Sequence, residues 1–215
     1  MDSKTMTMVK KITDGDIVKA GATGLCAGAN LRTPCGERRV EFLRTGDLVV
    51  TRDNGLQAVV LIWTETVTVA EIAADPALGP VALEARVIGP MMPQKPLKLG
   101  AAHRLLIPGW RIDDEEDTEN CLVAARDVDG LELSEDTGDE DLTYYNIVFE
   151  KPQIFCANGM PVESFAPTEE SIKAIPKEAL EALRKAFPDL GPKFSKYPEI
   201  TYKRRASVSY TPDFA

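Results

Sequence analysis

The feature that most constrains the fold is a series of short apolar and β-branched runs, each ended by residues typical of turns. The clearest example is LVVTRDNGLQAVVLIWTETVTV, in which β-branched runs lie on both sides of Asn54–Gly55. An Asn-Gly pair in this setting is among the strongest signals for a β-hairpin. Further strand-like runs are RRVEFL, VALEARVIG, HRLLIPGW, NCLVAARDV, TYYNIVFE and QIFCANG. Many short strands at short spacing predict a mainly β fold of the sandwich or barrel-like kind.

Two segments depart from this pattern and predict helical structure. The run TVAEIAADPALGP has helical composition and is ended by proline and glycine, which predicts a short helix or turn between strands. The run TEESIKAIPKEALEALRKAFPDLG places Leu180, Leu183 and Phe187 on one helical face, with Pro176 suited to the first turn. We predict an amphipathic helix here that packs on the β domain.

These signals divide the 215-residue chain into four parts. We expect a polar N-terminal leader over residues 1–23 and a β domain over residues 24–167. The predicted helix occupies residues 168–190, and a polar C-terminal tail follows over residues 191–215. With 44% hydrophobic residues the chain has enough apolar surface to bury a core.

Charge and composition exclude several classes of function. The net charge is -9, and the sequence has no basic face of the kind that nucleic-acid binders use. The acidic residues concentrate in DDEEDTEN and LSEDTGDEDL, which lack calcium-loop spacing and are typical of solvated loops. No run is apolar enough to span a membrane, and the N-terminus has no signal-peptide core. We expect a cytoplasmic protein, with secretion by a signal-independent route left open.

The cysteines and the histidine argue against a metal site. The four cysteines are Cys26, Cys35, Cys121 and Cys156, none of them in a C-x-x-C pair, and His103 is the only histidine. Zinc sites need clustered ligands, so we expect no metal, and no motif calls for another cofactor. The sequence predicts that Cys121 and Cys156 lie in apolar strands, whereas Cys35 lies in a turn. Scattered free thiols suit a reducing compartment.

Two residues are candidates for chemistry, and each has a structural alternative. His103 lies in KLGAAHRLLIPGW, either as a structural residue beside an apolar run or as a proton donor to a peptide bond in the N-terminal lead-in. Cys26 is either a small buried side chain in a Gly/Ala-rich turn or a nucleophile. A thiol attacks a carbonyl only when a neighbouring group lowers its pKa or removes its proton. His103 is the one histidine in the sequence that could do so.

Three blocks in order carry a family resemblance: TPCGERRVEFLRTGDLVVTRDNGLQAVV, GAAHRLLIPG and YYNIVFEKPQIFCANGMPVESFAP. They resemble the Hint domain shared by Hedgehog autoprocessing domains and inteins, and are most similar to its branch in marine alphaproteobacteria. The resemblance covers roughly Gly24 to Leu190. It implies a mainly β, disc- or horseshoe-shaped Hint fold of bent β-hairpins, followed by a C-terminal α-helix.

The resemblance also implies a reaction on the chain's own N-terminal segment. In this family the first Cys or Ser of the domain attacks the carbonyl of the preceding residue, giving an N-to-S acyl shift and a thioester. A histidine that matches His103 donates to the nitrogen of the scissile amide. With Cys26 as nucleophile, the scissile bond would be Leu25–Cys26, and the leader would be an intramolecular substrate.

The sequence departs from the family pattern at three places. The Thr or Ser expected three residues before the histidine is Gly100, and a further histidine found in many relatives is replaced by Pro152. Alignment without gaps places Gly24, not Cys26, at the nucleophile position. These departures favour a Hint protein with reduced or lost self-cleavage that acts as a structural or binding module. The alternative is cis-acting autoproteolysis at Leu25–Cys26.

Overall fold

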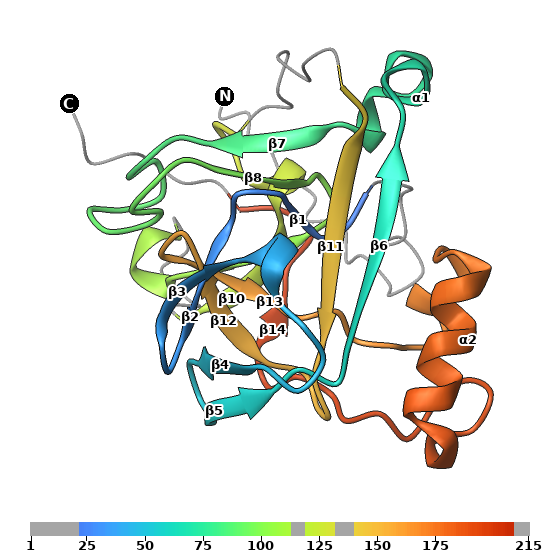
Figure 1. The fold of residues 1–215 in the computed structure, drawn as a ribbon. Coiled ribbons are helices and arrows are strands. Elements are labelled where there is room, and N and C mark those ends of the chain that lie inside the picture. Colours follow the sequence, from blue (N-terminus) through green and yellow to red (C-terminus); the bar gives the residue numbers. More distant parts are fainter. Residues whose placement is uncertain (1–21, 113–118, 132–139, 209–215) are drawn as a thin grey trace, which may run out of the picture.

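The computed structural model describes residues 22–112, 119–131 and 140–208. The leader expected over residues 1–23 and both acidic runs therefore lie largely outside the described residues. The chain forms two open sheets that are almost entirely antiparallel, and two short α-helices lie on one side of the molecule (Figure 1). This confirms the prediction of a mainly β fold with a helix near the C-terminus.

The first sheet has five strands in the order β6–β11–β1–β8–β7. Its longest strands, β6 and β11, pair over seven residues each and form one edge of the sheet (Figure 1). The short strand β1 lies between β11 and β8 and is antiparallel to both. The strands are β1 (Leu25–Cys26), β6 (Leu61–Val67), β7 (Pro80–Leu83), β8 (Leu97–Gly100) and β11 (Leu142–Val148).

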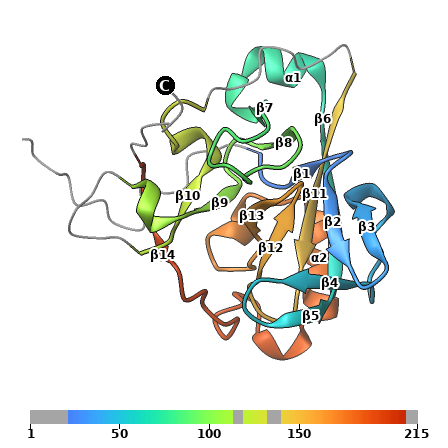
Figure 2. The same cartoon turned by 90° about the vertical axis from the view of Figure 1, so that its left-hand side faces the viewer.

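The second sheet follows the order β14–β10–β9–β13–β12–β2–β3, and β4 also pairs with β12 and with β5. Figure 2 shows the β4–β5 hairpin at one end of this sheet. The strands are β2 (Asn30–Thr33), β3 (Gly36–Arg39), β4 (Leu48–Thr51), β5 (Gly55–Ala58), β9 (Arg104–Ile107), β10 (Cys121–Ala124), β12 (Ile154–Ala157), β13 (Met160–Glu163) and β14 (Lys203–Arg204).

The hairpin predicted around Asn54–Gly55 is confirmed. Strands β4 and β5 pair with Thr51 opposite Gly55, and Gly55 has a φ of 62°, which glycine adopts without strain. The run RRVEFL, by contrast, is not a continuous strand. β3 ends at Arg39, and Val40–Phe42 form a 3-10 turn. Val40 is buried there and its N–H donates to Ala29 O, so the chain turns into the core instead of continuing along the sheet.

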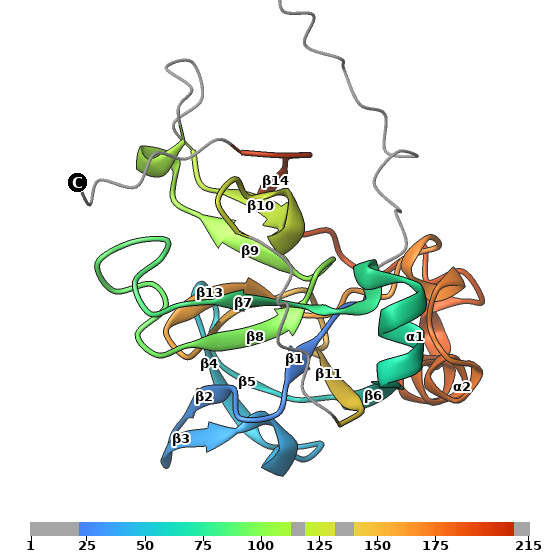
Figure 3. The same cartoon turned by 90° about the horizontal axis from the view of Figure 1, so that it is seen from above.

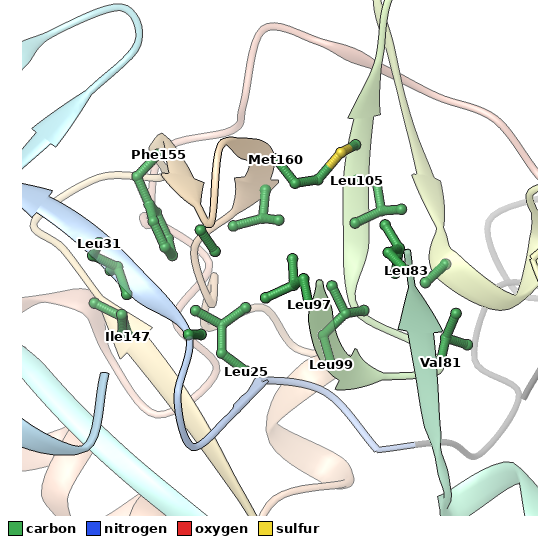
Figure 4. Packing of buried hydrophobic residues seen from close by; sticks show 14 of the residues in the cluster. Leu25, Leu31, Val81, Leu83, Leu97, Leu99, Leu105, Ile147, Phe155 and Met160 are labelled. Atoms are coloured by element: carbon green, nitrogen blue, oxygen red, sulfur yellow. The ribbon is translucent and has the colours of Figure 1, made fainter. Parts of the chain in front are cut away.

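Side chains of both sheets form the main hydrophobic core. Figure 4 shows leucines of β1 and β8 packed close to the aliphatic and aromatic side chains of β9 and β12. Leu25, Leu99, Leu105 and Phe155 are each at most 1% exposed. Burial of so much apolar surface is the main stabilising contribution to the fold. It also holds β1, and therefore the segment before it, in a fixed place.

Each predicted helical segment contains a helix, but each helix is shorter than its segment. The α-helices are α1 (Val69–Ala74) and α2 (Lys177–Ala186), which lie on the same side of the molecule when seen from above (Figure 3). Pro176 is the N-cap of α2 and is not in its first turn. Ala179 and Leu183 pack against a cluster that includes Trp63 of β6. Neither helix in the described part of the chain is long and apolar enough to cross a membrane.

Candidate functional site

The candidate site is the point where the segment before β1 meets the turn between β8 and β9. That turn spans Gly100 to His103 and is closed by a hydrogen bond from His103 N–H to Gly100 O at 2.9 Å. Two of its amides hold the passing segment, because Gly100 N–H donates to Gly24 O at 2.9 Å and Ala102 N–H donates to Ala22 O at 3.0 Å. The turn thus places residues 22–24, the lead-in to β1, beside His103.

The peptide group between Thr23 and Gly24 is held at both ends. The Gly24 N–H donates to Nδ1 of His103 at 3.0 Å, and the Thr23 carbonyl accepts from Nδ2 of Asn146 at 3.2 Å. The Thr23 hydroxyl also donates to Oδ1 of Asn146 at 3.0 Å. Acyl transfer at a peptide bond is helped by a donor on the carbonyl oxygen, which Asn146 supplies, and by a proton donor at the nitrogen, where Nδ1 of His103 instead accepts.

Both glycines of the site lie where a side chain has no room. Gly24 has a φ of 109°, and an added Cβ would lie 2.9 Å from Nδ2 of Asn146 and 3.0 Å from Tyr145 O. A Cβ on Gly100 would collide with the Ala22 carbonyl group. The absence of a side chain at each position therefore allows the observed path of the lead-in.

His103 is buried and neutral at physiological pH. Burial, with a smaller contribution from the positive charge of Arg104, lowers its pKa from 6.5 to about 4. Since Nδ1 accepts the Gly24 hydrogen bond, the proton of the neutral ring is on Nε2. In this state Nδ1 has no proton to give to the Gly24 nitrogen.

Cys26 lies two residues beyond this peptide group. It belongs to an apolar cluster with Val67, Ile72 and Tyr144, whereas its neighbour Leu25 points to the opposite face of β1 and into the main core. Burial raises the pKa of the Cys26 thiol to about 12, with Lys98 opposing the shift. Such a thiol is almost entirely protonated at neutral pH and is a poor nucleophile.

The structure therefore brings together three of the four residues singled out in the sequence. His103 contacts the Thr23–Gly24 peptide group, Gly100 donates to the Gly24 carbonyl of the next peptide group, and Cys26 packs elsewhere. The peptide bond that contacts His103 is Thr23–Gly24, whereas Leu25–Cys26 lies within β1 between its two neighbouring strands.

The other cysteines take different positions, and none of the four forms a disulfide. Cys121 is buried in its apolar strand and Cys35 is exposed in its turn, whereas Cys156, expected to be a core residue like Cys121, is only partly buried. In the described parts of the chain no three His, Cys, Asp or Glu side chains are grouped so that they could hold a metal ion.

Asn146 is the site residue that the sequence reasoning missed. It is 1% exposed and lies in the apolar strand β11, where its amide makes both contacts to Thr23. A buried amide requires hydrogen-bond partners, so an asparagine inside TYYNIVFE is itself a signal of a specific polar contact. The sequence does not indicate which segment provides that contact.

The chain is similar to one protein family and to several solved structures. A family model described as "Hint domain" matches residues 23–169. A search of curated proteins found no match. Among solved structures, an intein-like domain from Clostridium thermocellum aligns at 12% identity and a TM-score of 0.44, covering 67% of this chain and 99% of its own. The gp41-1 intein aligns at 15% identity and a TM-score of 0.39, covering 67% and 98% of the two chains.

Proposed function

Since the chain belongs to the Hint domain family, we propose that it holds the Thr23–Gly24 peptide bond, the junction between its N-terminal leader and its β domain, without cleaving it. The domain then serves as a structural or binding module. One observation carries this proposal. The peptide bond on His103 is Thr23–Gly24, and the residue that follows that bond is a glycine. An N-to-S or N-to-O acyl shift needs a thiol or hydroxyl on that residue.

The state of His103 supports the same conclusion. Expulsion of the Gly24 amine would require a proton on its nitrogen, but Nδ1 accepts the N–H of that group and is unprotonated. A pKa of about 4 means that few molecules carry a second proton on the ring at neutral pH. The contacts hold the peptide group in its ground state and do not favour its cleavage.

The crowding at Gly24 indicates that a single substitution there would not restore self-cleavage. A cysteine at residue 24 would place its Cβ against Asn146 and the Tyr145 backbone, at a φ that L-residues rarely adopt. At Gly100, the Thr or Ser expected from the family would collide with Ala22. Gly24 and Gly100 therefore lack reactive groups, and they are also the residues that leave room for the lead-in.

Intact-mass measurement tests the proposal. The full chain is purified, incubated at neutral pH with and without dithiothreitol, and weighed over several days. We expect only the full-length mass of 23.5 kDa under both conditions. Release of residues 1–23 or of residues 1–25 would overturn the proposal. Release of residues 1–25 that the Cys26→Ala substitution abolishes would establish the alternative, autoproteolysis at Leu25–Cys26.

A further inference from the structure

The C-terminal segment over residues 200–208 adds a strand to one edge of the second sheet. Its strand β14 pairs in parallel with β10, with Arg204 opposite Leu122 (Figure 3). The backbone pairing continues beyond β14, because the Arg205 N–H donates to Leu122 O at 2.9 Å. On its other side β10 pairs with β9, so the C-terminal segment covers what would otherwise be an open sheet edge.

The apolar part of this contact comes from Ile200 and Tyr202. Both side chains pack on a small apolar patch of the second sheet. The patch consists of three side chains that are at most 2% exposed, namely Leu106, Leu122 and Ile154. The Tyr202 hydroxyl also donates to the Asp53 carboxylate at 2.9 Å. The sheet therefore holds an aliphatic and an aromatic side chain that are two residues apart.

The charged part of the contact joins basic residues of the segment to acidic residues of the domain. Arg204 donates to the carboxylate of Glu163 at 3.0 Å, and Glu163 is only 4% exposed. Lys203 forms a more exposed ion pair with Glu119 at 3.1 Å. A hydrogen bond to a buried carboxylate is stronger than an ion pair at the surface, so Arg204 is the main polar anchor of the segment.

The C-terminal segment is peripheral to the rest of the fold. The match to the Hint domain ends at residue 169, and of the described residues beyond it only Val208 belongs to the main hydrophobic core. Segments with few buried apolar contacts open at a lower free energy than the core. The edge of β10 can therefore lose its added strand while both sheets stay formed.

We propose that the β10 edge is a peptide-binding groove, which the chain's own C-terminal segment fills and from which an extended segment of another protein displaces it. The partner carries an aliphatic residue, an aromatic residue and an arginine at alternate positions, as Ile200, Tyr202 and Arg204 do. In recognition by strand addition, backbone hydrogen bonds supply affinity and alternate side chains supply specificity. The inference rests on the proposed function, because it gives the binding module a class of partner.

The C-terminal segment competes with any partner because it is tethered to the groove. A tethered segment acts at an effective concentration of roughly millimolar, so a free peptide binds only weakly to the closed chain. A substitution that weakens the segment without changing the groove raises the fraction of open chains, and the apparent affinity for a peptide rises with that fraction. Substitution in a segment with a purely structural role would not create peptide binding.

Fluorescence anisotropy with the full chain tests the proposal. The probe is a labelled peptide with the sequence of residues 198–208, PEITYKRRASV. Arg204→Gln weakens the segment and leaves the buried Glu163 with its hydrogen bond from Arg104 at 3.3 Å. Arg184→Gln, at an exposed position of α2, is the matched control. We expect the Arg204→Gln chain to bind the peptide at least ten-fold more tightly than the wild type, and the Arg184→Gln chain to bind like the wild type.

Two further peptides separate sequence recognition from attraction by charge. A basic peptide is attracted to a chain with a net charge of -9 whatever its sequence, so a scrambled peptide of the same composition is needed. The second peptide carries the Arg204→Gln substitution itself. We expect both to bind the Arg204→Gln chain at least ten-fold more weakly than the original peptide does.

The proposal is wrong if the Arg204→Gln chain binds the peptide no more tightly than the wild type, or if the scrambled peptide binds equally well. A dimer of the wild-type chain that the peptide dissociates would identify a second copy as the occupant and would overturn the proposed partner. The same samples are weighed intact. A cleaved chain overturns the proposed function, whereas an intact chain without sequence-specific peptide binding overturns this inference alone.

Discussion

The backbone N–H of Gly24 donates to Nδ1 of His103 at 3.0 Å, so the only histidine of the chain is bonded to a peptide group and not to a thiol. This one contact fixes three properties of the site. It selects the Thr23–Gly24 bond as the one presented to the histidine, it places the ring proton on Nε2, and it leaves Nδ1 without a proton to donate to the Gly24 nitrogen.

We predict that Gly24→Ala is much more destabilising than Gly28→Ala. Both glycines have positive φ, 109° and 88°, so both substitutions cost about 1–2 kcal/mol in backbone strain. Only at Gly24 does the added Cβ meet Asn146 and Tyr145, since nothing lies within 4 Å at Gly28. We expect an additional loss of roughly 1–3 kcal/mol for Gly24→Ala, measured by urea unfolding. Equal losses for the two variants would show that the site is not crowded.

We predict that Gly100→Ser displaces the lead-in and does not restore cleavage. The new Cβ would occupy the space of the Ala22 carbonyl group, so the Gly24–His103 hydrogen bond must lengthen or break. The expected result is a shifted His103 imidazole signal and a loss of roughly 2 kcal/mol or more in unfolding free energy. Gly89→Ala is the control, because its added Cβ meets the flexible end of the Met92 side chain. An unmoved imidazole signal in Gly100→Ser would contradict the prediction.

The sequence was sufficient to predict the β4–β5 hairpin and the helix near the C-terminus, and it gave a contact between His103 and the lead-in as one of two alternatives. It was not sufficient to choose between Gly24 and Cys26, because a shift of two residues along a strand keeps the same face toward the same neighbours. The contacts that distinguish the two come from Asn146 and from the backbone of the Gly100 turn, which are distant in sequence from both.

A cavity of about 340 Å³ beside the Thr23–Gly24 bond was beyond sequence reasoning for a related reason. Trp63 lies in β6, Glu163 in β13 and Arg204 in β14, and the sequence around each residue gives no sign that the three line one cavity. Only the pairing of Glu163 with two arginines marks the place as polar. Those relationships depend on side-chain contacts that no local pattern encodes.

We predict that stability falls as the pH is lowered from 7.5 to 5, and that His103 causes the fall. Its pKa is about 4 in the folded protein and near 6.5 in the unfolded chain, so the unfolded chain binds a proton in this range and the native state does not. The free energy of unfolding should therefore decrease by about 2 kcal/mol between pH 7.5 and pH 5.

The matched variant for this prediction is His103→Gln, measured by urea unfolding at each pH. Glutamine can accept the Gly24 hydrogen bond but does not titrate. Burial raises the pKa of Glu65, which acts in the opposite direction and is retained in both proteins, so their difference isolates the histidine. The same pH dependence in both proteins would show that His103 titrates normally.

Finally, we predict that Cys26 is inert toward thiol reagents in the folded protein. Its pKa of about 12 leaves roughly a thousand-fold less thiolate at pH 8 than an ordinary cysteine has, and the side chain is buried among Val67, Ile72 and Tyr144. Cys35 is exposed, so iodoacetamide should modify Cys35 within minutes and leave Cys26 free until the protein is unfolded. Peptide mapping by mass spectrometry after timed quenching measures both rates, and Cys35→Ser removes the fast phase. Modification of Cys26 at a rate near that of Cys35 would mean that its thiol is accessible and ionisable, which would favour Cys26 as a nucleophile and weaken the case for an uncleaved module.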